Sequence, residues 1–388
     1  MPTLKYATNE AELKKLVSLF LKAETDIINT IGRLRSARNV DYHVIASLER
    51  VQAILRQMES DAWTYVPKVI EKQFYVSHPE ARRVQGESLT KHIRAYNNAA
   101  ALTAEQHAIV DQLVANLMGE ITDASVTVMA TVQSALIGRI EPDVYRRVGL
   151  EQVALRQATG QGVYKQLPQF VEALRREGVT AFVDKAGRRW SLHTYCSMVS
   201  RTTSRQAEVL SVLTADPEQD LYRISSHGTT CALCAPYEGR VYSKSGTSPD
   251  YPPLSDAFGK QDPNGPNTLT NTWLNIHPGC LHSIHSFTEA GRSAKEIQEI
   301  KDFSNPAKNP YSRDPRSQKQ IRAYRAKEQA RAKWLMEYRT WERYRMTVGD
   351  PVPKTFATFQ KHKAADDNKY KRWKKLYREA NKDGRRNS

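Results

Sequence analysis

Apolar residues recur at every third or fourth position along three long stretches of the chain, at residues 9–35, 43–72 and 104–138. This period places them on one face of a helix, and stripes of that width usually pack against one another. Residues 1–140 are therefore predicted to form a helical bundle region. The four histidines of this part stand far apart in the sequence, and nothing else here suggests chemistry.

The helical stretches become shorter after this region. Glycine and proline interrupt residues 142–212, which predicts short helices and, over 181–190, a small turn with extended flanks. A longer helix is predicted over 192–213. Residues 141–219 are therefore interpreted as a helical connector.

At Asp220 the spacing changes from helical to an alternation of apolar and polar residues. The segments DLYRISSH, GRVYS and CLHSIHSF are each typical of a strand. Residues 243–275, between the second and third of them, are rich in Pro, Gly, Asn, Asp and Ser. A loop of that length inside a compact domain is often functional or disordered. Residues 220–291 are predicted to form a small β-rich module.

Two further helices are predicted over 317–346 and 355–381, separated by VGDPVPK. Both mix Lys and Arg with aromatic residues. At spacings of three, four and seven, such aromatics pack on another helix or subunit more often than they stack on bases. Residues 292–388 are predicted to be a basic helical tail. The whole chain is then an α+β protein with a long N-terminal helical region, a small β-rich Cys/His module and this tail.

Charge distinguishes the tail from the rest of the chain. Residues 293–388 hold 26 Lys or Arg and 12 Asp or Glu, which accounts for +14 of the net charge of +16. Such a concentration indicates an acidic partner, and nucleic acid is the commonest one. The alternative is a solvated helical arm whose charge only keeps the protein soluble.

The composition excludes several classes of protein. No run of about 18 apolar residues exists, so a transmembrane span is not expected. The charged N-terminal segment lacks the apolar stretch of a secretory signal. Four cysteines among 388 residues do not make a disulfide framework. We therefore expect a reducing compartment, such as a cytoplasm, and no membrane partner.

Three of the four cysteines and four of the ten histidines fall in two short pieces of the β-rich module. Cys231 and Cys234 form C-x2-C, and His277, Cys280 and His282 form H-x2-C-x-H. Paired short motifs of this kind supply the four ligands of a structural zinc ion. The pattern predicts a zinc site made of the three cysteines and one histidine, with His277 or His282 as the fourth ligand.

Other interpretations of this cluster stay open, because the loop between the motifs is longer than in most zinc fingers. One is buried thiols beside histidines that hydrogen-bond to loop carbonyls. Another is catalysis, by an activated cysteine with a histidine base or by a zinc nuclease. A pair of cysteines argues against a single nucleophile, and the layout lacks the familiar core of a His-Asn-His nuclease. His227 and His285 lie nearby without a predicted role.

The same residues carry a resemblance. SSHGTTCALCAPYEGRVYSKSG, DYPPLSDAFG and HPGCLHSIHSFTEAG resemble the signature of the tailed-phage minor capsid protein 2 family, which is related in style to Mu-type head morphogenesis proteins. Ser226 and His227 match its Ser-Ser-His start, and Gly279 to His282 take the place of its Asn-Cys-Arg-His element. SQKQIRAYRAKEQARAK resembles the basic helix that follows the family's core. The resemblance covers roughly residues 195–380.

Two positions depart from the family. Cys231 stands where the family often has Arg, and Cys234 where it often has His. An exchange of His for Cys keeps a metal ligand, so the departures favour a metal-binding or structural use of the site over shared catalysis.

The resemblance implies a minor capsid or head morphogenesis protein of the virion, inside the capsid or at the connector, and in the host cytoplasm during assembly. Its expected partners are portal and capsid proteins and, through the basic tail, phage DNA bound without sequence specificity. The resemblance does not imply an enzyme. The alternative function is a zinc-dependent nuclease or a toxin-like effector packaged in the virion, motivated by the Cys and His residues around one loop.

Overall fold

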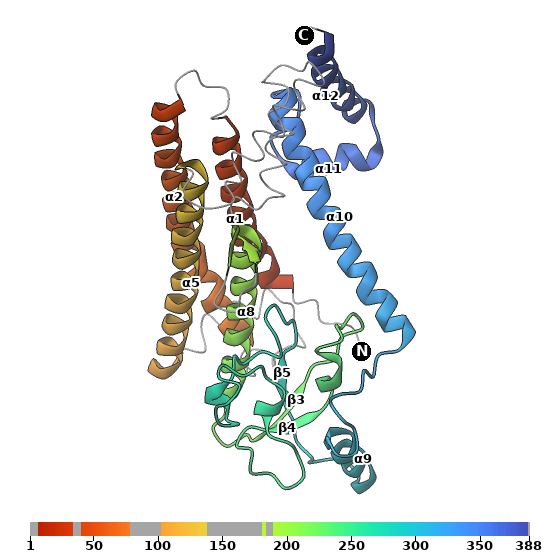
Figure 1. Ribbon diagram of the computed structural model, residues 1–388. Coiled ribbons are helices and arrows are strands. Elements are labelled where there is room, and N and C mark those ends of the chain that lie inside the picture. Colours follow the sequence, from red (N-terminus) through yellow and green to blue (C-terminus); the bar gives the residue numbers. More distant parts are fainter. Residues whose placement is uncertain (1–6, 34–39, 78–101, 138–180, 184–188, 387–388) are drawn as a thin grey trace. The chain divides into compact units, whose positions relative to one another are not determined.

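The protein combines long helices with small antiparallel sheets, which confirms the predicted α+β class (Figure 1). The computed structural model describes residues 7–33, 40–77, 102–137, 181–183 and 189–386. Residues 141–180, which make up the first part of the predicted connector, lie outside the described residues. The predicted boundaries at 140, 219 and 291 stay predictions.

The chain divides into two compact units, each built from three segments of the sequence. The first unit comprises residues 1–19, 59–122 and 194–325. The second comprises residues 20–58, 123–193 and 326–388. The β-rich module therefore belongs wholly to the first unit, and most of the basic tail belongs to the second.

The four long helices predicted within the first 213 residues are all present. They are α1 (Ala7–Arg33), α2 (Val40–Ser77), α5 (Ala104–Ile137) and α8 (Leu192–Leu213). The extended flanks expected around the small turn are β1 (Ala181–Val183) and β2 (Arg189–Ser191), which pair antiparallel. None of the helices in the described part of the chain combines the length and apolarity that a membrane crossing needs.

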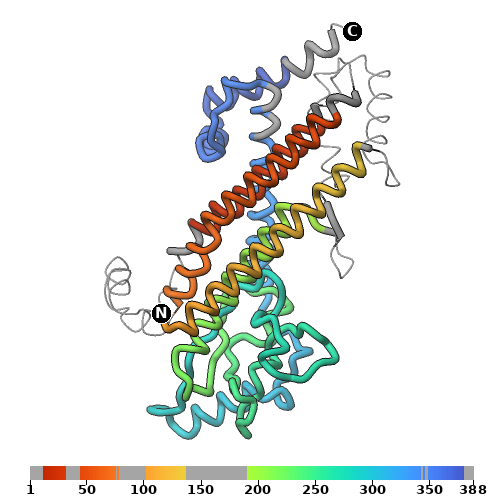
Figure 2. Tube along the Cα trace, turned by 90° about the vertical axis from the view of Figure 1, so that its left-hand side faces the viewer, coloured from red at the N-terminus to blue at the C-terminus, as the bar shows by residue number. Residues whose placement is uncertain are grey.

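In the first unit α8 contacts two of the other helices. It lies beside α5, where the Tyr195 hydroxyl donates a hydrogen bond to the Glu120 carboxylate (Figure 2). The Ser211 hydroxyl donates to the backbone oxygen of Phe74 on α2 at 2.6 Å. Apolar residues at the predicted spacing are buried in both units, among them Leu16, Ile70 and Leu117 in the first and Ile27, Leu55 and Val128 in the second.

The module is a three-stranded antiparallel sheet that follows α8 directly. Its strands are β3 (Leu221–Ile224), β4 (Val241–Ser243) and β5 (Ile284–Ser286), in the order β4-β3-β5, so all three predicted strands are confirmed. Tyr222 of β3 lies opposite Tyr242 of β4, and both are fully buried. They pack in one core with Val209, Val212 and Leu213 of α8. The end of α8 therefore supports the sheet.

The long loop expected over 243–275 is ordered and folds back on itself. The Gly259 N–H donates to Asn275 O, and the Trp273 N–H donates to Gly259 O, both at 2.8 Å. Gln206 of α8 donates to Trp273 O at 2.9 Å. Leu254, which lies within the loop, is fully buried in the module core. The loop thus carries the chain back to α8 just before the second Cys/His motif.

The described residues of the tail form four helices. They are α9 (Ala294–Ser304), α10 (Gln318–Val348), α11 (Phe356–Ala365) and α12 (Asn368–Arg386). The single helix predicted over 355–381 is wrong, because the chain breaks between α11 and α12. Asp366 takes a left-handed conformation with φ 42°, and the Asp367 carboxylate accepts from the Tyr370 N–H at 3.0 Å. Aspartate tolerates that conformation and caps helices well, which explains the break.

Candidate metal centre

The C-x2-C pair lies in a turn between β3 and the short 3-10 helix η2 (Ala235–Tyr237). The Ala235 N–H donates to Cys231 O at 3.1 Å, and the Tyr237 N–H donates to Cys234 O at 3.0 Å. This winding leaves the sulfurs of Cys231 and Cys234 within 4.8 Å of each other. Local backbone geometry therefore presents both sulfurs together.

The second motif is a turn held against α8. The Cys280 N–H donates to His277 O at 3.0 Å. Between them Gly279 has a φ of 75°, a conformation that a residue with a Cβ rarely adopts. The Gly279 N–H donates to Thr202 Oγ1 of α8 at 3.0 Å. Helix α8 thus fixes where this turn meets the first one.

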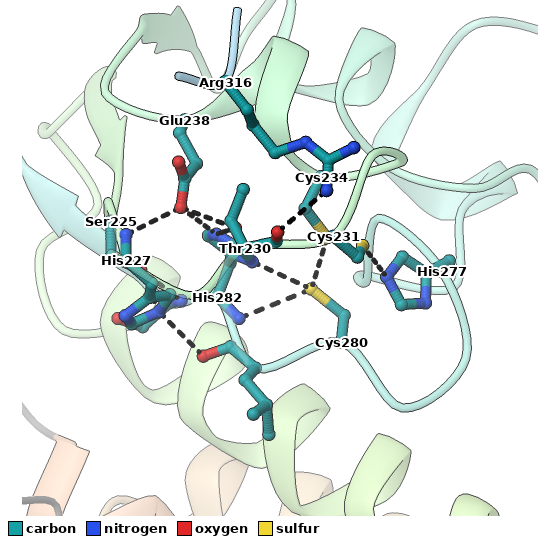
Figure 3. Close-up of polar contacts among 12 residues, drawn as sticks. Ser225, His227, Thr230, Cys231, Cys234, Glu238, His277, Cys280, His282 and Arg316 are labelled. Carbon is teal, nitrogen blue, oxygen red and sulfur yellow. Dashed lines mark hydrogen bonds and ion pairs between the residues drawn. The ribbon is translucent and has the colours of Figure 1, made fainter. Parts of the chain in front are cut away.

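Three sulfurs and two ring nitrogens converge where the two turns meet (Figure 3). The shortest separations are 3.6 Å for Cys234 Sγ to Cys280 Sγ, 3.2 Å for Cys231 Sγ to His277 Nε2, and 3.5 Å for Cys280 Sγ to His282 Nδ1. Neighbouring ligand atoms around a tetrahedral zinc ion lie about 3.3–3.8 Å apart, as follows from the usual zinc–sulfur and zinc–nitrogen distances. The separations are close to this range.

The five residues form two overlapping groups that share Cys234. One is Cys231, Cys234 and His277, the other is Cys234, Cys280 and His282, and within each group the ligand atoms lie within 4.8 Å of one another. All four cysteines of the chain are free thiols. The Cys/His groups are thus positioned to hold a metal ion.

Each histidine is held by the nitrogen that faces away from the sulfurs. His277 Nδ1 lies 2.8 Å from Pro278 O, and His282 Nε2 lies 2.6 Å from Glu238 Oε1. A carboxylate or carbonyl behind the ring is the usual way in which proteins orient a histidine ligand toward a metal. The donor set and its support therefore both fit a metal ion.

Glu238 organises the side of the cluster away from the cysteines. Its Oε1 also accepts from the His227 N–H at 2.6 Å and from Thr230 Oγ1 at 2.7 Å. Arg316, from the segment before α10, donates to Thr230 O at 3.2 Å. Glu238, Thr230 and Arg316 were not among the predicted site residues, since none of them belongs to the two Cys/His motifs.

Electrostatics place negative charge on two of the three sulfurs, those of Cys231 and Cys280, whereas hydrogen bonding to these two thiolates raises the pKa of the Cys234 thiol. Hydrogen bonds from the Cys234 thiol, supported by those from the histidines, lower the pKa of Cys231 to about 3 and that of Cys280 to about 4. Burial opposes protonation of His282, but its hydrogen bonds to Cys280 and Glu238 raise its pKa to about 9. Thiolates are the form of cysteine that binds metals, and here the protons on neighbouring groups offset their negative charge. A bound cation would supply the same balance.

The remaining Cys and His residues of interest lie outside both groups. The His227 ring packs edge-on against His282 with centroids 4.6 Å apart, and its Nε2 lies near Ser225 Oγ and Leu281 O. His285 lies on β5 opposite Arg223. Cys196 is buried in α8, as expected for a small apolar residue. The structure thus brings together the five predicted ligands and leaves the other three residues apart.

A cavity of about 320 Å³ adjoins the Glu238 side of the cluster. Its polar lining includes His227, Glu238 and Arg316. The cysteines do not line it. The cavity and the sulfur cluster are therefore neighbouring features that share Glu238 as a wall.

Comparison with known proteins places the chain in a family. Searches of curated proteins and of solved structures gave no match. The sequence model of the family described as phage minor capsid protein 2 matches residues 7–338, which is most of the chain. It includes the three long N-terminal helices, the whole Cys/His module and the greater part of α10. The chain therefore belongs to the phage minor capsid protein 2 family and is a structural component of the phage virion.

Proposed function

We propose that the protein is a minor component of a tailed-phage head that lies near the portal, holds its β-rich module together with one zinc ion and contacts packaged DNA through its basic tail. The family match carries the virion role. The N-terminal helices are the proposed docking surface for portal and capsid subunits, since amphipathic helices are common docking elements. The zinc site and the DNA contact have separate support.

The zinc proposal assigns Cys231, Cys234, Cys280 and His282 as ligands. His282 is favoured over His277 because its side chain is 6% exposed and Glu238 orients it. Three thiolates and one imidazole suit a closed tetrahedral site, which is the structural form of zinc. The role proposed for the ion is to join two turns that belong to distant parts of the module.

The DNA proposal rests on the charge of the tail and on its exposure. All ten residues of α10 from 325 to 334 are exposed, and four of them are Lys or Arg against one Glu. A helical stretch that buries no side chain needs a partner or serves as a spacer in solvent. A polyanion such as DNA suits a basic helix of this kind, and the contact would go to phosphates rather than to bases.

Removing the tail after Ser317 is expected to weaken DNA binding at least about 100-fold at 50 mM salt, because many phosphate contacts are lost at once. The cut is placed there because the preceding segment packs on the module: Arg316 donates to Thr230 O, and Tyr311 packs against the module core. Binding of duplex DNA by the full and shortened chains would be compared by fluorescence anisotropy. Equal affinities for the two chains would rule out the DNA contact.

The cavity beside Glu238 favours a second candidate, a zinc-dependent nuclease or effector. It places a histidine, a carboxylate and a guanidinium beside the proposed metal site, and these are groups that hydrolases use. Plasmid cleavage by the zinc-loaded protein, abolished by His227→Ala with the fold intact, would support this candidate. Cleavage that persists in both His227→Ala and His282→Ala would argue against it.

A further inference from the structure

The last part of the chain folds into a unit that the family match does not include. The match ends at residue 338, and residues 339–388 carry 15 Lys or Arg against 6 Asp or Glu. The end of α10, α11 and α12 nevertheless pack together over residues 341–377 (Figure 1). We call this segment the C-terminal aromatic unit.

Aromatic side chains form its core. Phe359 of α11 is fully buried and Trp373 of α12 is 5% exposed, and their rings stack with centroids 5.8 Å apart. Tyr344 of α10 stacks on Tyr377 of α12 at 4.6 Å. The Trp341 indole N–H donates to Pro353 O at 2.9 Å. The aromatics of the tail therefore pack on one another, as predicted, and hold α12 firmly in place.

Helix α12 has two faces of opposite character. Tyr370, Trp373 and Tyr377 follow helical spacing and pack into the core. Lys371, Lys375 and Arg378 recur at steps of four and three on another face, and all are exposed. A sequence at this period places the three cations in a row along the helix.

The row has a charge spacing of the same order as that on a nucleic-acid strand. With a rise of about 1.5 Å per residue, neighbouring cations are about 4.5–6 Å apart along the axis, which lies between one phosphate step of about 3.4 Å and two steps of about 6.8 Å. Lys371 lies 3.6 Å from Asp366 and Lys375 lies 3.8 Å from Glu379, with all four side chains largely exposed. Exposed pairs of this kind are weak and exchange readily for phosphate.

We infer that the C-terminal aromatic unit is a module for duplex DNA, added after the family region, which binds backbone phosphates through Lys371, Lys375 and Arg378 of α12. The inference rests on the proposed DNA contact of the tail and assigns that contact to one helix face. The aromatic core keeps the row rigid, so that binding needs little ordering of the chain. The contact is to phosphate and is independent of base sequence.

The test uses the full chain with Lys371→Gln, Lys375→Gln and Arg378→Gln combined. Removal of three phosphate contacts is expected to reduce the slope of log K against log salt by about 2.7 and to weaken binding at 100 mM salt at least about tenfold. The matched control replaces Lys15 of α1 and Arg50 and Arg56 of α2, three exposed cations outside the tail, by Gln. The control removes the same charge, and its slope of log K against log salt is expected to stay within about one unit of the wild-type slope.

The outcomes separate this inference from the proposed function. If the chain cut after Ser317 loses DNA and the α12 variant binds like wild type, the assignment to α12 is wrong and the tail contact stands. Equal losses in the α12 variant and the control would also overturn it, because net charge alone would then explain binding.

Tighter binding to poly-L-glutamate than to DNA at equal salt would indicate an acidic protein partner instead. If the wild-type chain binds no DNA, both proposals fail. Near-ultraviolet circular dichroism checks that the aromatic core is intact in each variant.

Discussion

Replacing Cys280 with serine is expected to release zinc and to unfold the β-rich module at a much lower temperature than in the wild type. Cys280 has the Cys234 thiol and the His282 ring as its nearest partners, at 3.6 Å and 3.5 Å. A serine hydroxyl is a poor zinc ligand, so the site loses one of its four bonds. Structural zinc contributes about 10–16 kcal/mol of apparent binding energy in small zinc-finger peptides. We expect a loss of at least about 3 kcal/mol in this larger module.

Calorimetry and elemental analysis of the same sample measure this effect. Cys196→Ser is the matched control, because Cys196 is also a buried free cysteine but lies in α8 outside both ligand groups. The control is expected to keep one zinc ion per chain. A Cys280→Ser protein with unchanged metal content and an unchanged unfolding temperature would mean that the cysteines are only buried thiols.

Replacing Arg240 with alanine is expected to destabilise the module by about 3 kcal/mol. Arg240 is the largest side chain that is fully buried in the described residues. Its guanidinium donates to Pro236 O at 2.6 Å and to Ser304 O at the end of α9. It also lies over the Tyr311 ring, 4.7 Å from the centroid. One side chain therefore ties the C-x2-C turn, α9 and the segment after it to β4.

Two variants separate packing from hydrogen bonding at this position. Arg240→Met fills the space but leaves two carbonyl oxygens without a donor, so we expect a loss of about 1–2 kcal/mol. Urea denaturation would give both values. If Arg240→Ala lowers the free energy of unfolding by less than about 0.5 kcal/mol, the role given to Arg240 is contradicted, because a change that small is typical of substitutions at surface positions. Zinc content is expected to be unchanged in both variants.

The elements with regular spacing could be predicted from the sequence. The long N-terminal helices and α8 follow from apolar periodicity, and the three strands from alternation around Tyr222, Tyr242 and Ile284. The break at Asp366 could not, because both sides of it favour helix and only the local conformation of two aspartates ends α11. The ordered loop was also uncertain, since its hydrogen bonds join residues such as Gly259 and Asn275 that no pattern relates.

For the candidate site too, the sequence pattern predicts only part of what the structure contains. Its five Cys and His residues were found from type and spacing alone, because soft ligands in paired short motifs are rare without a metal. Glu238 and Arg240 could not be found in this way, since charged residues are usually solvated. Their roles depend on a partner more than 40 residues away, His282 for one and Ser304 for the other. Only the fold brings such partners together.

Zinc K-edge X-ray absorption on the purified wild-type protein tests the central claim most directly, since it counts the ligands of the ion. The proposed site predicts about one zinc ion per chain, bound by three sulfur atoms at about 2.3 Å and one nitrogen atom at about 2.0–2.1 Å, with no open position for water. A protein without zinc, or zinc surrounded only by oxygen and nitrogen atoms, would contradict it.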